Sequence, residues 1–205
     1  MCLLLASLSL KAAKSDTLYT RYERGIYHTC AIRHVKADIR AADSLVDLLI
    51  YQFRTDPDML FDWAFKGLGN DQKLKERKEV QLHFKKTEYD GQSSIGTMWV
   101  DVEVPGVKTF HDVAVKSRIL KSSVPNEQSR ATMEVFYSNS LLKDAHGTLF
   151  VYKEANNTIT IRMDMYVTFG WFFNIFITQR RYRNIVEWRA RDFVNNLAVA
   201  FHAAK

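Results

Sequence analysis

The sequence predicts an α+β fold in which antiparallel strands are followed by one long C-terminal helix. Over residues 79–169, apolar side chains recur at every second position in several runs, as in strands with one buried face. Over residues 170–204 they recur every three or four positions, as on one side of a helix. Gly and Pro are scarce, with 8 and 3 among 205 residues, which fits long elements joined by short turns.

One strand and two helices are predicted before the alternating region. Residues 21–35 are rich in β-branched and aromatic side chains, which favours one long strand. Residues 37–53 have helical spacing, with Asp38 as a suitable cap. Asp56 and Pro57 then interrupt the chain, and a short helix is predicted over residues 59–65. The stripe of the first helix is Ile39, Ala42, Leu45, Val46, Leu49, Ile50 and Phe53.

Six strands are predicted in the alternating region. The first begins at residue 79 and the second includes residues 98–104, where Pro105 and Gly106 turn the chain into a strand over 107–120. A polar loop is predicted over 122–129, before strands over 130–138, 148–153 and 159–169. In the last strand Ile159, Ile161, Met163, Met165, Val167 and Phe169 face inward, and Thr160, Arg162, Asp164, Tyr166 and Thr168 face outward. Outward charges on strands are expected to be solvated or paired across strands.

Gly170 is expected to end the last strand, and the rest of the chain through Ala204 is predicted to be one long helix. Arg189 lies on its apolar side, where the stem of an arginine can pack along apolar surface. The inward stripe is Tyr182, Ile185, Val186, Arg189, Phe193, Leu197 and Phe201.

Length and composition predict a single folded domain over residues 21–205, preceded by a signal-derived or arm segment over residues 1–20. The chain is 47% hydrophobic, 25% charged and 13% aromatic, which excludes disordered and collagen-like proteins. Its two cysteines exclude a disulfide scaffold and a Cys-rich zinc site.

The N-terminus leaves the compartment open. Residues 3–10 resemble the apolar middle of a secretory signal, but no basic residue precedes them. One interpretation is export to the periplasm or cell envelope with a truncated signal sequence, and the other is a helical arm on a cytoplasmic protein. The longest run without a charge, residues 165–179, is too short and too polar to span a membrane.

The net charge of +6 is concentrated near the C-terminus. Residues 177–205 hold six basic and two acidic side chains. The chain shows no zinc-finger spacing, no aromatic RNP-type strand motif and no Gly-x-x-Gly loop, so nucleic acid is not expected as a partner. The basic excess is expected to form a solvated face.

No motif in the sequence indicates a specific reaction. The six histidines lack metal-ligand spacing, and a Gly-x-Ser-x-Gly elbow and a phosphate loop are both missing, so neither a metal nor a cofactor is predicted. Cys30 is expected to be a small buried side chain. Asp101 and Glu103 are expected on an outer strand face. No catalytic residue is therefore assigned, and the enzyme question stays open with a preference against one.

The order of elements resembles the START-like helix-grip (SRPBCC) superfamily, particularly its bacterial members. The superfamily includes pollen-allergen proteins, polyketide cyclases and lipid-transfer domains. The resemblance covers residues 21–203 and is most specific at residues 168–188, TFGWFFNIFITQRRYRNIVEW. It implies a curved seven-stranded antiparallel sheet that grips the C-terminal helix, with an apolar cavity between them and two shorter helices after the first strand.

The same resemblance implies which side chains line that cavity. Four methionines are among the candidates, and methionine adapts to ligands of different shapes. The alternative for each residue is that it simply fills the core. The candidates are Met98, Val100, Met133, Val135, Met163 and Met165 from strands, Phe193, Leu197 and Phe201 from the last helix, and Trp63 and Phe65 at the mouth.

Three functions remain open at this stage. The first is a binding or carrier domain for a lipid-like or other apolar small molecule, and the second is a cyclase or hydratase in the same cavity. The third is a peripheral membrane or partner-binding protein, because aromatic rings beside arginines suit a membrane interface. The contact residues would be Trp171, Phe172, Arg180 and Arg181, which otherwise plug or flank the end of the sheet.

Overall fold

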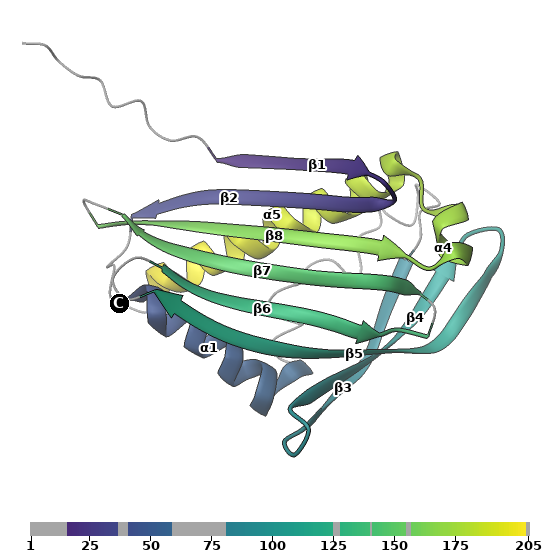
Figure 1. Ribbon diagram of the computed structural model, residues 1–205, viewed down its shortest axis with the longest axis horizontal. Helices are drawn as coiled ribbons and strands as arrows, with labels where there is room; N and C mark the ends of the chain where they lie inside the picture. The colour runs from purple at the N-terminus through teal and green to yellow at the C-terminus, as the bar shows by residue number, and fades with distance from the viewer. Residues whose placement is uncertain are drawn as a thin grey trace, which may run out of the picture.

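A computed structural model describes residues 16–36, 41–58, 81–124, 128–139, 141–154 and 157–203 (Figure 1). The strands are β1 (Thr17–Glu23), β2 (Ile26–Lys36), β3 (Gln81–Asp90), β4 (Ile95–Val104), β5 (Lys108–Val124), β6 (Gln128–Tyr137), β7 (Leu142–Glu154) and β8 (Thr158–Phe169). The helices are α1 (Ala41–Thr55), α4 (Trp171–Phe176) and α5 (Gln179–Ala203).

The strands form one antiparallel sheet, with eight strands among the described residues in the order β1-β2-β8-β7-β6-β5-β4-β3. Pairing of β2 with β8 joins the N-terminal hairpin to the last strand. Helices α1 and α5 both lie behind the sheet in Figure 1, so one face is covered by helices. The predicted α+β class, with an antiparallel sheet and a long C-terminal helix, is confirmed.

The predicted first strand, residues 21–35, is two strands joined by a tight turn. Arg24 and Gly25 both have positive φ, 51° and 84°, as a two-residue hairpin turn requires. An Arg-Gly pair is a weak turn signal in sequence because arginine rarely adopts this conformation. The sheet therefore gains a strand over the predicted seven, and it begins at Thr17 rather than at residue 21.

Two strand boundaries also differ from the prediction. The polar stretch 122–129 was predicted as a loop, but Ser122, Ser123 and Val124 pair with β6. Ser129 is buried, and its hydroxyl donates a hydrogen bond to Asp43 of α1, which explains a serine in this position. Strand β7 begins at Leu142, six residues before the predicted start, because its polar first residues lie on exposed positions.

The sheet bends sharply, and Figure 1 shows β3 and β4 turning away from the other strands. Register shifts occur between Phe84 and Lys86, between Val100 and Val102, and between Lys116 and Ser117. Bulges of this kind kink a strand and increase its twist. The bends lie on the strands that curl, so the predicted curvature has a local cause.

Helix α1 packs its predicted stripe on the sheet. Leu45, Val46, Leu49, Ile50 and Phe53 are all buried. The ring of Phe53 lies over Gly96 of β4, where an added Cβ would be 2.6 Å from Cζ. Glycine is thus required for this close approach. Asp38 and the predicted short helix over 59–65 lie outside the described residues.

The predicted continuous C-terminal helix is two helices, α4 and α5, separated at Ile177 and Thr178. The Tyr27 hydroxyl donates a hydrogen bond to the Ile177 carbonyl at 3.0 Å. The Thr178 hydroxyl accepts a hydrogen bond from the Arg181 backbone N–H at 3.3 Å, as a helix cap does. This break lets α4 close one end of the sheet while α5 crosses its face.

Candidate functional site

Four of the predicted cavity-lining side chains come together on the inner face of β6, β7 and β8. Met133 of β6 and Met165 of β8 are both paired with Gly147 of β7. Val135 and Met163 occupy inward positions next to this row. Because Gly147 has no side chain, Met165 packs over the middle strand; a Cβ there would be in ordinary contact, 3.5 Å from Met165 Cγ.

Burial decreases along this inner face. Ile159 and Ile161 of β8 are fully buried, Met163 is nearly so, and Met165 and Val167 are only half-buried. The same change occurs on β6, where Ala131 is buried and Met133 and Val135 are half-buried. The inner face is therefore fully buried at one end and only partly buried in the middle.

The described residues form two separate apolar clusters, and the middle region belongs to the larger one. That cluster joins α1 and α5 to β2, β6, β7 and β8; it includes Met163 and Leu197, with Met133, Met165 and Phe193 packed against it. The smaller joins β4 and β5 to α4. Met98 and Val100 belong to the smaller cluster, apart from the other candidates. Trp63 and Phe65 lie outside the described residues, as does the side chain of Phe201.

A small polar group, missed at the sequence level, lies at the inner face where α5 begins. Tyr27 and Tyr182 stack with ring centroids 4.1 Å apart. Thr29 donates a hydrogen bond to the Tyr182 hydroxyl at 3.5 Å and shares another with Thr20 at 3.0 Å. Burial raises the pKa of Tyr182 to about 12 and also raises that of Tyr27. Correct splitting of the first strand would have placed Tyr27 and Thr29 inward by alternation.

This polar group offers limited chemistry. Both tyrosine hydroxyls are engaged, and their raised pKa values make either a poor base at neutral pH. The inward positions of β2, β7 and β8 hold no histidine or carboxylate. Nor do the described residues contain a group of three or more His, Cys, Asp or Glu suited to a metal ion.

Arg189 on α5 has unusual surroundings. Its Nε is shielded from solvent and has no hydrogen-bond partner, and burial lowers the pKa of the guanidinium. Among the described residues the other such orphan atom is Gln52 Oε1, on α1. Buried polar atoms are paired in the large majority of cases, so each orphan needs an explanation. The predicted packing of the Arg189 stem did not reveal this missing partner.

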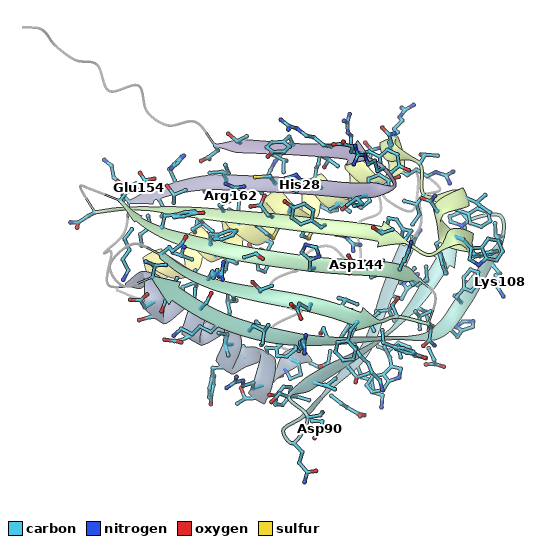
Figure 2. All side chains as sticks on the ribbon, in the orientation of Figure 1. His28, Asp90, Lys108, Asp144, Glu154 and Arg162 are labelled. Atoms are coloured by element: carbon cyan, nitrogen blue, oxygen red, sulfur yellow. The ribbon has the colours of Figure 1, made fainter. Side chains whose placement is uncertain are left out.

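The outer face of the sheet contains a buried charge that is fully paired. Asp164 was expected to be outward and solvated or paired; it is outward and paired, but only 3% exposed. Its carboxylate accepts hydrogen bonds from Arg162 at 2.6 Å and from His28 at 2.9 Å. Figure 2 looks onto this helix-free face, with His28 and Arg162 on neighbouring strands. Cys30 is buried here too, as expected, and burial raises the pKa of its thiol.

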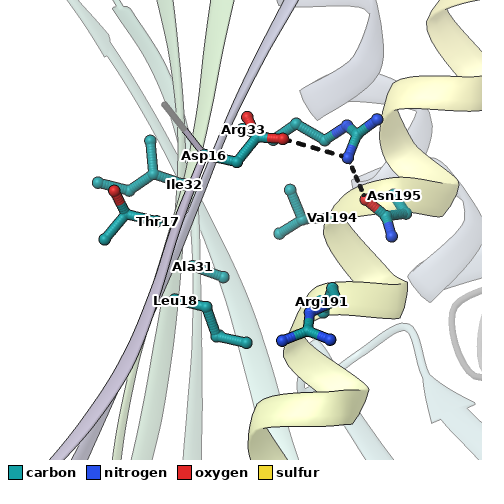
Figure 3. Close-up of a pocket in the computed structure, with 9 residues that line it drawn as sticks. All are labelled: Asp16, Thr17, Leu18, Ala31, Ile32, Arg33, Arg191, Val194 and Asn195. Carbon is teal, nitrogen blue, oxygen red and sulfur yellow. Dashed lines mark hydrogen bonds and ion pairs between the residues drawn. The ribbon is translucent and has the colours of Figure 1, made fainter. Parts of the chain in front are cut away.

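A pocket of about 370 Å³ lies at the sheet edge, between the β1–β2 hairpin and α5 (Figure 3). Arg33 crosses it and donates hydrogen bonds to Asn195 at 2.7 Å and to Asp16 at 3.3 Å. Leu18 and Arg191 also line it. Three of its polar side chains, those of Arg33, Asn195 and Asp16, already bond one another, so it resembles an edge groove more than a closed binding site.

The segment of aromatic residues and arginines over residues 171–183 is partly exposed. Trp171 is 79% exposed and Ile175 is 65% exposed on α4, whereas Phe172 packs against Phe110 and Phe173. Arg180 and Arg181 are exposed, and Arg181 donates a hydrogen bond to the Phe176 carbonyl at 3.0 Å. In the described part of the chain, no helix is long and apolar enough to cross a membrane.

Solved structures with this arrangement are known. A STAR-related lipid transfer protein from Xanthomonas axonopodis superposes with a TM-score of 0.52 and 12% identity, over 94% of this chain and 96% of that one. A START superfamily protein from Mycobacterium smegmatis gives 0.49 and 9%, over 87% and 99%. Norcoclaurine synthase from Thalictrum flavum gives 0.46 and 10%, over 92% and 90%.

No protein-family model matches the sequence, and no curated protein matches it. The superposition on the Xanthomonas axonopodis structure covers nearly all of both chains, so this chain has the START-like helix-grip fold. At this level of identity the likeness shows the fold alone, since one fold carries many functions.

Proposed function

We propose that this protein is a binding or carrier domain for a lipid-like or other apolar small molecule, held between the middle of the sheet and α5. The observation that carries the proposal is the half-burial of inward Met133, Val135 and Met165 beside fully buried core residues. Apolar side chains that face a covering helix yet stay reachable provide a surface for an apolar ligand.

Affinity would come from the apolar area removed from water. That term is about 25 cal/mol per Å² before the costs of association are subtracted. Methionine side chains at the centre of the surface can change rotamer to fit different chains or rings. The proposal requires no metal and no cofactor.

The proposal predicts that protein purified from its own host carries an apolar molecule. Native mass spectrometry of the intact chain, followed by organic extraction, tests this directly. A bound mass that disappears on extraction supports the carrier function. A preparation free of bound molecules that also takes up no added fatty acid or long-chain alcohol contradicts it.

A cavity-filling variant locates the site. Val135→Trp places a large ring at a half-buried inward position, and we expect it to abolish uptake of the apolar ligand while the protein stays folded. Phe136→Trp is the matched control, because Phe136 is the next residue and is 52% exposed. If Val135 is instead tightly packed, overpacking would cost roughly 1–3 kcal/mol of the free energy of unfolding.

Two alternatives have specific support. Stacked Tyr27 and Tyr182 favour a cyclase or hydratase in the same cavity, although both hydroxyls are already hydrogen-bonded. Exposed Trp171 and Ile175 beside Arg180 favour a membrane or partner contact at α4. Liposome flotation of Trp171→Ala and Arg180→Ala decides the second alternative, with Tyr51→Ala as a control because Tyr51 is also exposed. Flotation equal to that of the wild type would remove it.

A further inference from the structure

We infer that Arg189 binds the acidic headgroup of the ligand, so that the cargo is an amphiphile with an anionic oxygen group on an apolar chain. This inference rests on the proposed function and narrows its ligand class. Two observations support it: the unpaired, solvent-shielded Nε of Arg189 and its place on the side of α5 that faces the inner surface.

The position of Arg189 follows from helix geometry. Residues separated by four or seven positions lie on one side of a helix. Seven residues before Arg189 is Tyr182, which is buried against Tyr27, and four residues after it is Phe193, which packs on the larger cluster. Arg189 therefore lies between two side chains that face the sheet. The residue as a whole is half-buried, so part of it borders open space.

No protein group among the described residues neutralises this guanidinium. Asp192, the acid one turn further along α5, forms no ion pair with Arg189. Burial raises the pKa of Asp192, and the charge of Arg191 only partly opposes that rise. Two other arginines near α5 have partners of their own: Arg183 donates to the Thr20 carbonyl at 3.0 Å, and Arg33 bonds Asn195 and Asp16. A guanidinium whose Nε is shielded from water without a partner carries a desolvation cost in the free protein, and an oxyanion ligand would remove that cost.

The chemistry of the guanidinium selects the ligand class. Its planar donors fit a carboxylate or a phosphate through two parallel hydrogen bonds. The half-buried methionines on the sheet would receive the apolar chain while Arg189 holds the acid. A neutral alcohol of the same chain length would bury the same apolar area but leave the guanidinium unpaired.

The test compares dodecanoate, dodecyl phosphate and dodecanol on the full chain, with binding measured by titration calorimetry. We expect the wild type to prefer the two anions over dodecanol. Arg189→Met should weaken binding of the anions about 10- to 100-fold, the usual loss for a charge-assisted hydrogen bond, and leave dodecanol unchanged. Arg189→Lys should give an intermediate loss of affinity, since lysine keeps the charge but lacks the planar pair of donors. The anion that binds with the higher affinity identifies the preferred headgroup.

Arg191→Met is the matched control, because Arg191 is two residues away and lines the edge groove instead. Loss of anion binding in Arg191→Met but not in Arg189→Met would place the acid in the groove and overturn the inference. Equal binding of dodecanoate and dodecanol, unaffected by Arg189→Met, would overturn the inference and leave the carrier function standing. Binding of none of the three probes would contradict both.

Discussion

The outer face of the sheet and the inward side of α5 each contain a charged group with at least one atom shielded from water, and their surroundings are opposite. On the outer face, the Asp164 carboxylate accepts hydrogen bonds from Arg162 and His28. On α5, Arg189 Nε has no partner, and no carboxylate of the described residues forms an ion pair with the side chain. The protein thus supplies hydrogen-bond partners for the Asp164 carboxylate and none for Arg189 Nε.

This difference separates a structural charge from a binding charge. Removing one partner from a completed buried pair leaves the other charge unpaired and is strongly destabilising. Removing a charge that has no partner relieves a desolvation cost, so the ligand-free protein should lose no stability. The two sites should therefore respond in opposite directions when each is neutralised, and the following predictions test that contrast.

The largest effect is expected at Asp164. Asp164→Asn should lower the free energy of unfolding by about 2–4 kcal/mol, because it leaves Arg162 without its charged partner. Asp144→Asn is the control: its carboxylate is 65% exposed and lies 3.8 Å from His146, so a change within about 0.5 kcal/mol is expected. Urea unfolding measures both. Equal small effects would show that the outer pair is not structural.

The same pair should make stability depend on pH. Burial raises the pKa of Asp164, but hydrogen bonds from Arg162 and His28 outweigh it and hold the pKa below its ordinary value. A carboxyl with a lowered folded-state pKa stabilises above its unfolded pKa of about 4, and this contribution is lost as pH falls through the folded value. We expect the free energy of unfolding to fall more steeply below about pH 4 in the wild type than in Asp164→Asn. Parallel acid titrations of the two proteins would contradict this.

Two glycine substitutions contrast the closed and the reachable parts of the inner face. Gly96→Ala would push a methyl group into the Phe53 ring and should cost about 1–3 kcal/mol of the free energy of unfolding. Gly147→Ala makes only an ordinary contact with Met165 and should change it by less than about 1 kcal/mol. Thermal unfolding of both variants measures the difference. A large loss at Gly147 would mean that the middle of the inner face is tightly packed.

The smallest stability change, with the opposite sign, is expected at Arg189. Arg189→Met removes an unpaired charge, so the ligand-free protein should gain up to about 1 kcal/mol in the free energy of unfolding. Arg191→Met, on an exposed position of the same helix, should be close to neutral. The ligand must first be extracted, because a bound molecule would stabilise the wild type selectively. A clear loss of stability in Arg189→Met would show that the guanidinium is structural.

The sequence predicted the features that depend on periodicity. Alternation placed Ile159 to Phe169 correctly on one strand, and the part of the α1 stripe from Leu45 to Phe53 was buried as expected. It missed features that depend on single backbone angles or on distant partners. The Arg24-Gly25 turn has no typical signal, and Ser129 becomes a buried strand residue only because Asp43 reaches it.

The candidate site shows the same division. Alternation and the family resemblance grouped Met133, Val135, Met163 and Met165, which the sheet brings together. They did not predict that Met98 lies apart, in the second cluster. The missing partner of Arg189 could not be predicted, because unpairing depends on every residue around the side chain and not on its own position in a helical stripe.

The most direct test of binding between sheet and helix is methyl nuclear magnetic resonance of the protein with labelled methionines, of which the chain has six. On addition of dodecanoate to extracted protein, we expect the methyl signals of Met133 and Met165 to shift strongly and that of Met98 to shift less. Saturable binding that leaves the Met133 and Met165 signals unchanged would contradict a ligand site between the sheet and α5.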